Sequence, residues 1–183
     1  MCNSPETEND YRPITLLNCC LKLITKLLAN WLQKVILKII HKNQYGFLKG
    51  RSIQDCLAWA FEYIHQCQSS GRACCILKLD FAKAFDSINW ESLHKIMAVR
   101  GFPPLWCDWM DTLFHSSRSA VLLNLVPGHW FQDKCGLRQG DPISPYLFVI
   151  CAEGLSALLI DAEERGITHG VKVCPRAPSV SHL

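Results

Sequence analysis

The sequence predicts an α+β fold, and three observations support this prediction. Long segments with the apolar spacing of helices occur together with short apolar runs typical of strands. These segments follow one another without strict alternation, which argues against a parallel α/β architecture. Of the 183 residues, 49% are hydrophobic and 19% are charged, so the chain can form a substantial core and is not generally disordered.

The first predicted helix begins after Pro13 and extends to about Ile40. Apolar residues recur along it with helical spacing: Leu16, Leu17, Cys20, Leu23, Ile24, Leu27, Leu28, Trp31, Val35, Ile36, Ile39 and Ile40. Five lysines that are four or eight residues apart predict one basic stripe opposite the packed face, namely Lys22, Lys26, Lys34, Lys38 and Lys42. Residues 11–54 carry eight basic residues and no acidic one, which suits a polyphosphate partner. A solvated basic face is the simpler alternative.

The segment that follows is predicted to be a loop, a helix and a buried strand. The loop is NQYGFLKGRS, residues 43–52, and the helix extends from about Ile53 to Gln68, where SSGR ends it. The run ACCILKL, residues 73–79, is short, apolar and bounded, so we expect a strand that is buried on both faces and ends at Asp80.

Two consecutive helices are predicted next. Asn89 is a suitable N-cap for a helix that extends to Val99, and Gly101 followed by Pro103 ends that helix. A further helix is expected at residues 104–115.

The C-terminal part is predicted to contain a hairpin, a long helix and a last strand. Residues 119–134 are expected to form the hairpin, turning at Pro127 and Gly128. The long helix is expected to have Asp141 as its N-cap and Pro142 in its first position. The run HGVKV, residues 169–173, is the candidate last strand.

Asp80 and Phe85 are the first candidates for chemistry. A carboxylate at the end of a buried strand is costly unless it is paired, hydrogen-bonded or bound to a cation. If Asp80 holds magnesium and a nucleoside triphosphate, an aromatic ring at Phe85 would lie beneath the sugar and clash with a 2′-hydroxyl. The alternatives are that Asp80 caps a turn and that Phe85 is a core aromatic residue.

The second candidate is the run GLRQGDPISP, residues 136–145. It precedes a predicted helix N-terminus, where backbone N–H groups and the helix dipole favour anions. Gly140 allows a ligand to approach the backbone closely, and Gln139 offers a donor and acceptors beside it.

Cysteine usage and hydropathy limit the other classes of function. The eleven cysteines include no C-x-x-C pair, so zinc has weak support and reduced thiols packed in the core are expected. We predict an intracellular protein without a membrane segment, because the polar head shows no signal-peptide pattern and no apolar run reaches roughly 18 residues.

Five segments in this order carry a family resemblance. They are YRPITLLN, NQYGFLKGRS, LKLDFAKAFDSINW, the pair GF at 101–102, and GLRQGDPISPYLF. Together they resemble the reverse transcriptase domain of non-LTR (LINE-type) retrotransposons, in the form common in plant genomes, over nearly the whole chain. The resemblance implies a right-hand polymerase fold with a polar head at 1–10, basic helical fingers at 11–70 and an incomplete palm at 71–183, with fingers segments allowed to interleave.

The same resemblance implies an RNA-directed DNA polymerase site with two Mg²⁺ ions. Asp80 matches the first metal-binding aspartate, with the Phe81 carbonyl as co-ligand, and Phe85 matches the residue that excludes ribonucleotides. Gln139 and Gly140 match the turn that contacts the incoming nucleotide. The resemblance also implies that three fingers residues contact the triphosphate or the template, namely Arg12, Lys49 and Arg51. The lysines implied to contact the template backbone are Lys22, Lys26, Lys34 and Lys38. The implied partners are an RNA template, a DNA primer and deoxynucleoside triphosphates, and the implied location is the nucleus.

The sequence departs from the family pattern in one respect. The next family motif, an aromatic residue, a variable residue and two aspartates, is missing, and no Asp-Asp pair occurs in the chain. We therefore expect at most one partial metal site and no polymerisation by this chain as written. A non-catalytic RNA-binding remnant and a non-functional relic are the alternatives, and the oligomeric state is left open.

Overall fold

The computed structural model describes residues 14–172 and 179–182, and its elements are helices with two small antiparallel sheets. The helices are α1 (Cys19–Gln33), α2 (Ile36–Ile39), α3 (Ile53–Ser69), α4 (Trp90–Val99), α5 (Pro104–His115) and α6 (Ser144–Glu164). The strands are β1 (Arg118–Ser119), β2 (Leu122–Leu123), β3 (Val126–Pro127) and β4 (Phe131–Gln132). β1 pairs with β4 (Arg118 opposite Gln132), and β2 pairs with β3 (Leu122 opposite Pro127). This agrees with the predicted α+β class.

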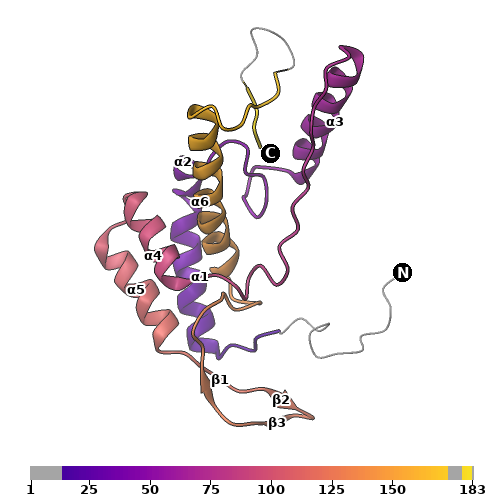
Figure 1. Cartoon of the computed structure of the whole chain (residues 1–183). Helices are drawn as coiled ribbons and strands as arrows, with labels where there is room; N and C mark the ends of the chain where they lie inside the picture. The colour runs from indigo at the N-terminus through magenta and orange to yellow at the C-terminus, as the bar shows by residue number, and fades with distance from the viewer. Residues whose placement is uncertain (1–13, 173–178, 183) are drawn as a thin grey trace.

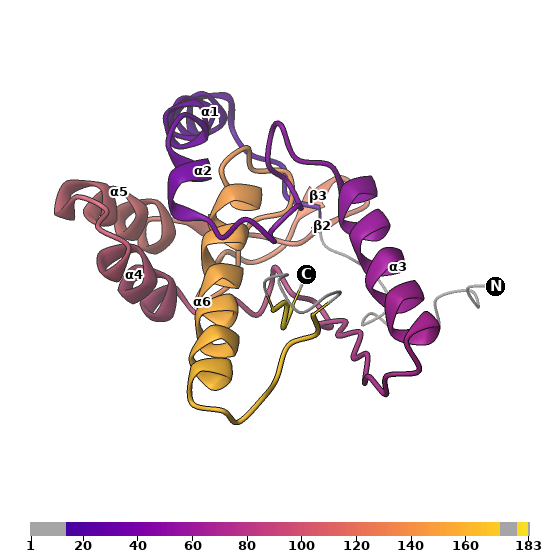
Figure 2. The ribbon, with the colours of Figure 1, turned by 90° about the horizontal axis from the view of Figure 1, so that it is seen from above.

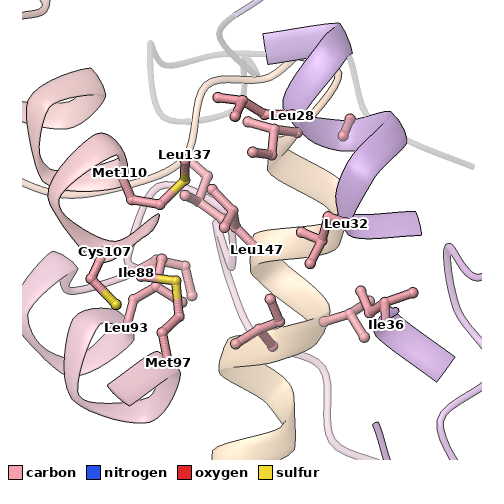
Figure 3. Close-up of a cluster of buried hydrophobic side chains, with 14 of the residues drawn as sticks. Leu28, Leu32, Ile36, Ile88, Leu93, Met97, Cys107, Met110, Leu137 and Leu147 are labelled. Carbon is pink, nitrogen blue, oxygen red and sulfur yellow. The ribbon is translucent and has the colours of Figure 1, made fainter. Parts of the chain in front are cut away.

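The core lies around α6, with α1 on one side of it and α4 and α5 on another (Figures 1 and 2). Figure 3 shows its buried side chains, which come from these four helices, α2 and two loops: Leu28, Leu32, Ile36, Ile88, Leu93, Met97, Cys107, Met110, Leu137 and Leu147. Complete burial of one such side chain stabilises a fold by about 1.5 to 3 kcal/mol. The loop residues Ile88 and Leu137 are therefore held by the same core as the helices.

The limits of α4 and α5 follow the local signals in the sequence. The Asn89 side chain accepts a hydrogen bond from the Ser92 N–H at 2.8 Å, so Asn89 is the N-cap, as predicted. Gly101 follows the C-terminus of α4 with φ +80°, and α5 occupies residues 104–115 as predicted. The prediction for α3 is also confirmed, because that helix occupies Ile53–Ser69.

The predicted start of the long helix is wrong by about two residues. Ile143 is the N-cap of α6, and Pro145 lies in the first turn. Asp141 precedes the helix, and its Oδ1 accepts the Ile143 N–H at 3.3 Å. The carboxylate thus closes a turn before the helix and does not cap it.

The predicted first helix is two helices. α1 ends at Gln33, where the Lys34 and Val35 N–H groups bond to carbonyls only three residues back, and α2 follows. Lys34 therefore lies at the end of α1 and Lys38 lies in α2, so the basic stripe extends over two helices. All five lysines of the stripe are exposed.

The prediction of a buried strand at residues 73–79 is wrong. These residues form no strand, and every residue from Gly71 to Asp80 is exposed. A buried strand needs partners for both its edges and both its faces. Within 14–172 and 179–182 the paired strands are confined to the hairpin, and α3 stands apart from the helical core (Figure 1).

The hairpin forms, but its turn differs from the predicted one. The turn lies at Asn124 and Leu125, both with positive φ (49° and 66°), between β2 and β3. Two positive φ values in a two-residue loop match the twist of paired strands, whereas Pro127 lies within β3. Of the predicted last strand, Val171 forms an isolated bridge with Val180, and residue 173 lies outside the described residues.

Most cysteines of the described part are not in the core, contrary to the prediction. Only Cys67 and Cys107 are buried among the nine cysteines that the structure describes, all of which are free thiols. Burial raises the pKa of the Cys107 thiol, so this thiol stays protonated as expected of a small core residue.

α6 is the one described helix that is long and apolar enough to cross a membrane, with a mean hydropathy of 1.6 over its best 18-residue window. Here Leu147, Val149 and Ile150 on this helix are buried in the core, and the helix also carries the buried Glu153. The absence of a membrane segment stays a prediction.

Candidate functional site

The glycine-containing turn at residues 136–141 is joined directly to the segment after Asp80. The Gly136 N–H donates to the Ile88 carbonyl at 2.7 Å, and the Leu137 N–H donates to the Phe85 carbonyl at 2.8 Å. The Trp90 indole N–H donates to the Gly136 carbonyl at 2.7 Å. Two candidate regions that are about fifty residues apart in sequence therefore form one unit.

The other end of this turn contacts the N-terminal segment. The Thr15 N–H donates to the Gln139 carbonyl at 3.0 Å. Gly140 has φ +98°, and a Cβ there would lie 3.3 Å from the Thr15 carbonyl oxygen. Phe85, Gln139 and Gly140, which the sequence singled out, are thus brought together by backbone hydrogen bonds.

Asp141 anchors the turn to the core. It is only 6% exposed, its carboxylate lies beside the Thr25 side chain of α1, and Arg138 Nη1 lies 3.9 Å from its Oδ2. Arg138 also donates to the Leu113 carbonyl of α5 at 3.1 Å. Burial raises the pKa of Asp141, while Thr25, the Ile143 N–H and Arg138 lower it by less.

A pH dependence follows from this raised pKa. Between the ordinary Asp pKa of about 3.9 and the higher folded-state pKa, the folded state binds more protons, so the Asp141 contribution to stability falls as pH rises through that window. We expect Asp141→Asn to remove this decline, because its amide oxygen still accepts the Ile143 N–H but cannot ionise. Urea unfolding at pH 4 to 7 measures the effect, with exposed Asp108→Asn as the control. A wild-type minus Asp141→Asn difference that stays flat across this range would contradict the prediction.

Phe85 belongs to a cluster of three aromatic rings. It stacks on Phe148 of α6, with ring centroids 4.7 Å apart and planes 6° from parallel. Phe47 meets both rings edge-on, at 6.2 Å from Phe85 and 6.4 Å from Phe148. Phe85 is half-buried, so one part of its ring packs against the core while another part stays accessible.

The loop at residues 43–52 lies beside this cluster and α6 (Figure 2). Arg51 Nη1 donates to the carbonyls of His41 and Gln44, both at 2.6 Å, so this guanidinium holds the loop in shape. Lys49 is exposed, and it lines a groove of about 480 Å³ together with Arg51, Phe47 and Tyr146. The predicted basic residues of this loop are therefore adjacent to the aromatic cluster.

A buried carboxylate fixes the segment that leads into this loop. Glu153 of α6 is 3% exposed, and its two oxygens accept the His41 N–H at 2.9 Å and Arg100 Nη2 at 2.6 Å. Arg100 Nη1 also donates to the Ile39 carbonyl at 3.4 Å. Nothing in the local pattern of the sequence identified Glu153 or Arg100, or the contact of Phe148 with Phe85, because these contacts join distant segments.

The predicted magnesium ligands do not form a complete metal site in the described part of the structure. Asp80 and Phe81 are exposed in the unpaired segment, and the described ranges contain no group of three His, Cys, Asp or Glu side chains able to hold a metal ion. One carboxylate and one carbonyl do not fit a pair of divalent ions about 4 Å apart. Arg12 lies outside the described residues.

Comparison with known proteins gives a consistent result. The sequence profile of the family described as reverse transcriptase (RNA-dependent DNA polymerase) matches residues 4–174. A "Transposon TX1 uncharacterized 149 kDa protein" of Xenopus laevis is 27% identical over 150 residues, which cover 82% of this chain and 12% of that protein. A Pol polyprotein from the type-2 retrotransposable element R2DM of Drosophila melanogaster is 26% identical over 146 residues, covering 80% of this chain and 14% of that protein.

A plant protein is similar over a shorter stretch. The uncharacterized mitochondrial protein AtMg01250 of Arabidopsis thaliana is 44% identical over 62 residues, covering 34% of this chain and 51% of that protein. The chain therefore spans between about an eighth and about half of the length of these relatives.

Proposed function

The chain belongs to the reverse transcriptase (RNA-dependent DNA polymerase) family, and we propose that it supplies the deoxynucleotide- and template-binding part of a non-LTR retrotransposon polymerase. In this proposal residues 11–70 belong to the fingers and residues 71–183 to the palm. The element is proposed to be a plant one, in line with the similarity to an Arabidopsis protein. It is further proposed to act in the nucleus on an RNA template and a DNA primer.

The observation that carries the proposal is the placement of Phe85. Its backbone carbonyl is hydrogen-bonded to the turn that carries Gln139 and Gly140, and through Phe47 its ring adjoins the groove lined by Lys49 and Arg51. A triphosphate in that groove would meet the Lys49 ammonium, and the attached sugar would face the accessible part of the Phe85 ring. A ring in that position leaves no room for a 2′-hydroxyl and so selects deoxyribose.

We propose that Asp80 and the Phe81 carbonyl contribute to one Mg²⁺ site. The family uses two ions, which supply charge neutralisation of the phosphates when bound. Because the 183 residues contain no Asp-Asp pair, polymerisation by this route requires carboxylates from outside this sequence. Within the chain, the proposed roles are nucleotide binding, sugar selection and template binding.

Primer extension tests the polymerase part of the proposal. If the reading frame continues past the Leu183 codon into an aromatic-x-Asp-Asp sequence, the longer protein is expected to extend a DNA primer on an RNA template. Asp80→Ala is expected to abolish extension, whereas Asp108→Ala, at an exposed aspartate of α5, is expected to leave it unchanged. Equal extension by the two variants would refute a role for Asp80.

Non-catalytic RNA binding is the second candidate function, and the exposed lysines of α1 and α2 favour it. Neutralising one phosphate of single-stranded RNA contributes about 0.7 to the slope of log affinity against log salt. Replacing Lys22, Lys26, Lys34 and Lys38 by alanine is therefore expected to reduce the slope by about 2.8 and to weaken binding at low salt. Fluorescence anisotropy of the 183-residue chain with labelled RNA over a KCl series measures this slope.

A matched variant separates the basic stripe from net charge. Alanine at four other exposed basic residues removes the same charge, namely Lys95, Lys134, Arg165 and Lys172. This control is expected to change the slope by less than 1. If both quadruple variants lose the same slope, the stripe is a solvated face and not a binding site.

A further inference from the structure

We propose that Phe148 and Phe47 are positioning residues for sugar selection, because they fix the plane of the Phe85 ring from two sides. This inference rests on the proposed function, in which Phe85 excludes the 2′-hydroxyl. It adds that the discrimination belongs to three rings from three segments and that Phe85 alone is not sufficient.

The first support is the stack between Phe85 and Phe148. The centroid distance of 4.7 Å and the angle of 6° describe two nearly parallel rings in contact. Such pairs contribute about 0.5 to 1.5 kcal/mol beyond their buried area. Phe148 is itself held firmly, because Leu147, Val149 and Ile150 around it on α6 are buried in the core. A stack on a rigid helix restricts rotation of the Phe85 ring out of its plane.

The second support is the backbone of Phe47. This residue has φ +59°, a conformation that costs a non-glycine residue about 1 to 2 kcal/mol. The residue is nonetheless 58% exposed, so simple burial does not account for the conformation. What the conformation achieves is a pair of edge-on contacts, 80° to the Phe85 ring and 84° to the Phe148 ring. Strained backbone that persists in this way is typical of functional sites.

The third support is that the backbone of Phe85 and the segment that carries Phe47 are both fixed in place. The Phe85 carbonyl accepts the Leu137 N–H, which fixes the backbone from which the ring projects. Leu48, next to Phe47, is 5% exposed and belongs to the core cluster. The ring orientation of Phe85 is therefore set by packing on each side, whereas a single ring in an open loop would rotate away from a clashing hydroxyl.

The test compares dCTP and CTP binding to the 183-residue chain in Mg²⁺, by competition with a fluorescent deoxynucleotide. Phe85→Val is expected to abolish the preference for dCTP. Phe148→Leu is expected to reduce the preference about tenfold with little change in dCTP affinity, because shifts of about 1 Å in a positioned group have effects of that order or larger. Phe47→Gly is expected to reduce the preference for dCTP as well. Glycine accommodates the positive φ at this position, and Phe47 is exposed, so this second variant leaves the packing of the core intact. Phe131→Leu, which removes a half-exposed ring on β4, is the control and is expected to leave the preference intact.

A second measurement needs no nucleotide. In the chain labelled with ¹³C-phenylalanine, the Phe85 ring signals are expected to shift and to show faster ring flips in Phe148→Leu, but not in Phe131→Leu. Unchanged Phe85 signals in Phe148→Leu and Phe47→Gly would overturn the inference.

The binding results separate this inference from the proposed function. Loss of preference in Phe85→Val with full preference in Phe148→Leu and Phe47→Gly overturns the positioning role and leaves the proposed function standing. A wild-type chain that binds dCTP and CTP equally refutes sugar selection by Phe85, and the inference built on it is then refuted as well.

Discussion

Replacing Arg100 with methionine is expected to lower the free energy of unfolding by about 3 kcal/mol, as for other buried pairs that lose one partner. The Glu153 carboxylate is 3% exposed and receives Arg100 Nη2 at 2.6 Å. Methionine retains the apolar stem but leaves that charge buried, with the His41 N–H as its remaining partner in the described structure. Because Arg100 is one-third exposed, the loss is expected at the low end of the range for buried pairs. Urea unfolding followed by circular dichroism measures it.

A surface pair on α6 provides the matched control. Arg165 contacts Asp161 at 2.9 Å, but the two side chains are 68% and 48% exposed. Arg165→Met is expected to cost less than about 0.5 kcal/mol. The double variant Arg100→Met/Glu153→Leu is expected to recover part of the loss, since no unpaired charge is then buried. Equal losses for the two single methionine variants would show that burial of Glu153 is not what matters.

Gly136→Ala is expected to destabilise the fold by about 2 to 5 kcal/mol, the sum of a backbone term and a steric term. Gly136 has φ +88°, and a Cβ there would lie 2.8 Å from the Asp86 carbonyl oxygen and 3.1 Å from its Cα. Backbone atoms cannot move aside as a flexible side chain can. The turn at Gly136 would have to move away from Asp86, and this movement would stretch the hydrogen bond from the Leu137 N–H to the Phe85 carbonyl. The NMR signals of the Phe85 ring are therefore expected to change as well.

Gly101→Ala measures the cost of the positive φ alone, without a steric clash. Gly101 has a similar φ of +80°, but no atom lies within 4 Å of a Cβ built there. Its replacement is expected to cost about 1 to 2 kcal/mol and to leave the Phe85 ring unaffected. Thermal and urea unfolding of the two variants in parallel test this difference, and equal costs would mean that the close approach to Asp86 is relieved without strain.

The candidate site was predictable in its composition but not in its assembly. Phe85, Gln139 and Gly140 were identified from sequence, and the structure joins their segments through Phe85, Leu137 and Thr15. The two rings that hold Phe85 were not predicted. Phe47 and Phe148 lie in segments that carry the family resemblance, but nothing there marked them as partners of Phe85. The apolar residues of α6 are spread around its axis, and the contacts of Phe47 depend on an unusual φ that only the folded loop reveals.

By itself, the sequence determined the family and the elements whose limits depend on neighbouring residues. Asn89, Gly101 and Pro103 set the ends of α4 and the start of α5 because capping acts within one helical turn. The tertiary structure decided the rest. Residues 73–79 have the composition of a buried strand, yet they stay exposed, since strand formation requires hydrogen-bonding partners from elsewhere in the chain. The environments of Glu153 and Phe85 were likewise set by contacts between segments far apart in sequence, and such contacts leave no local signal.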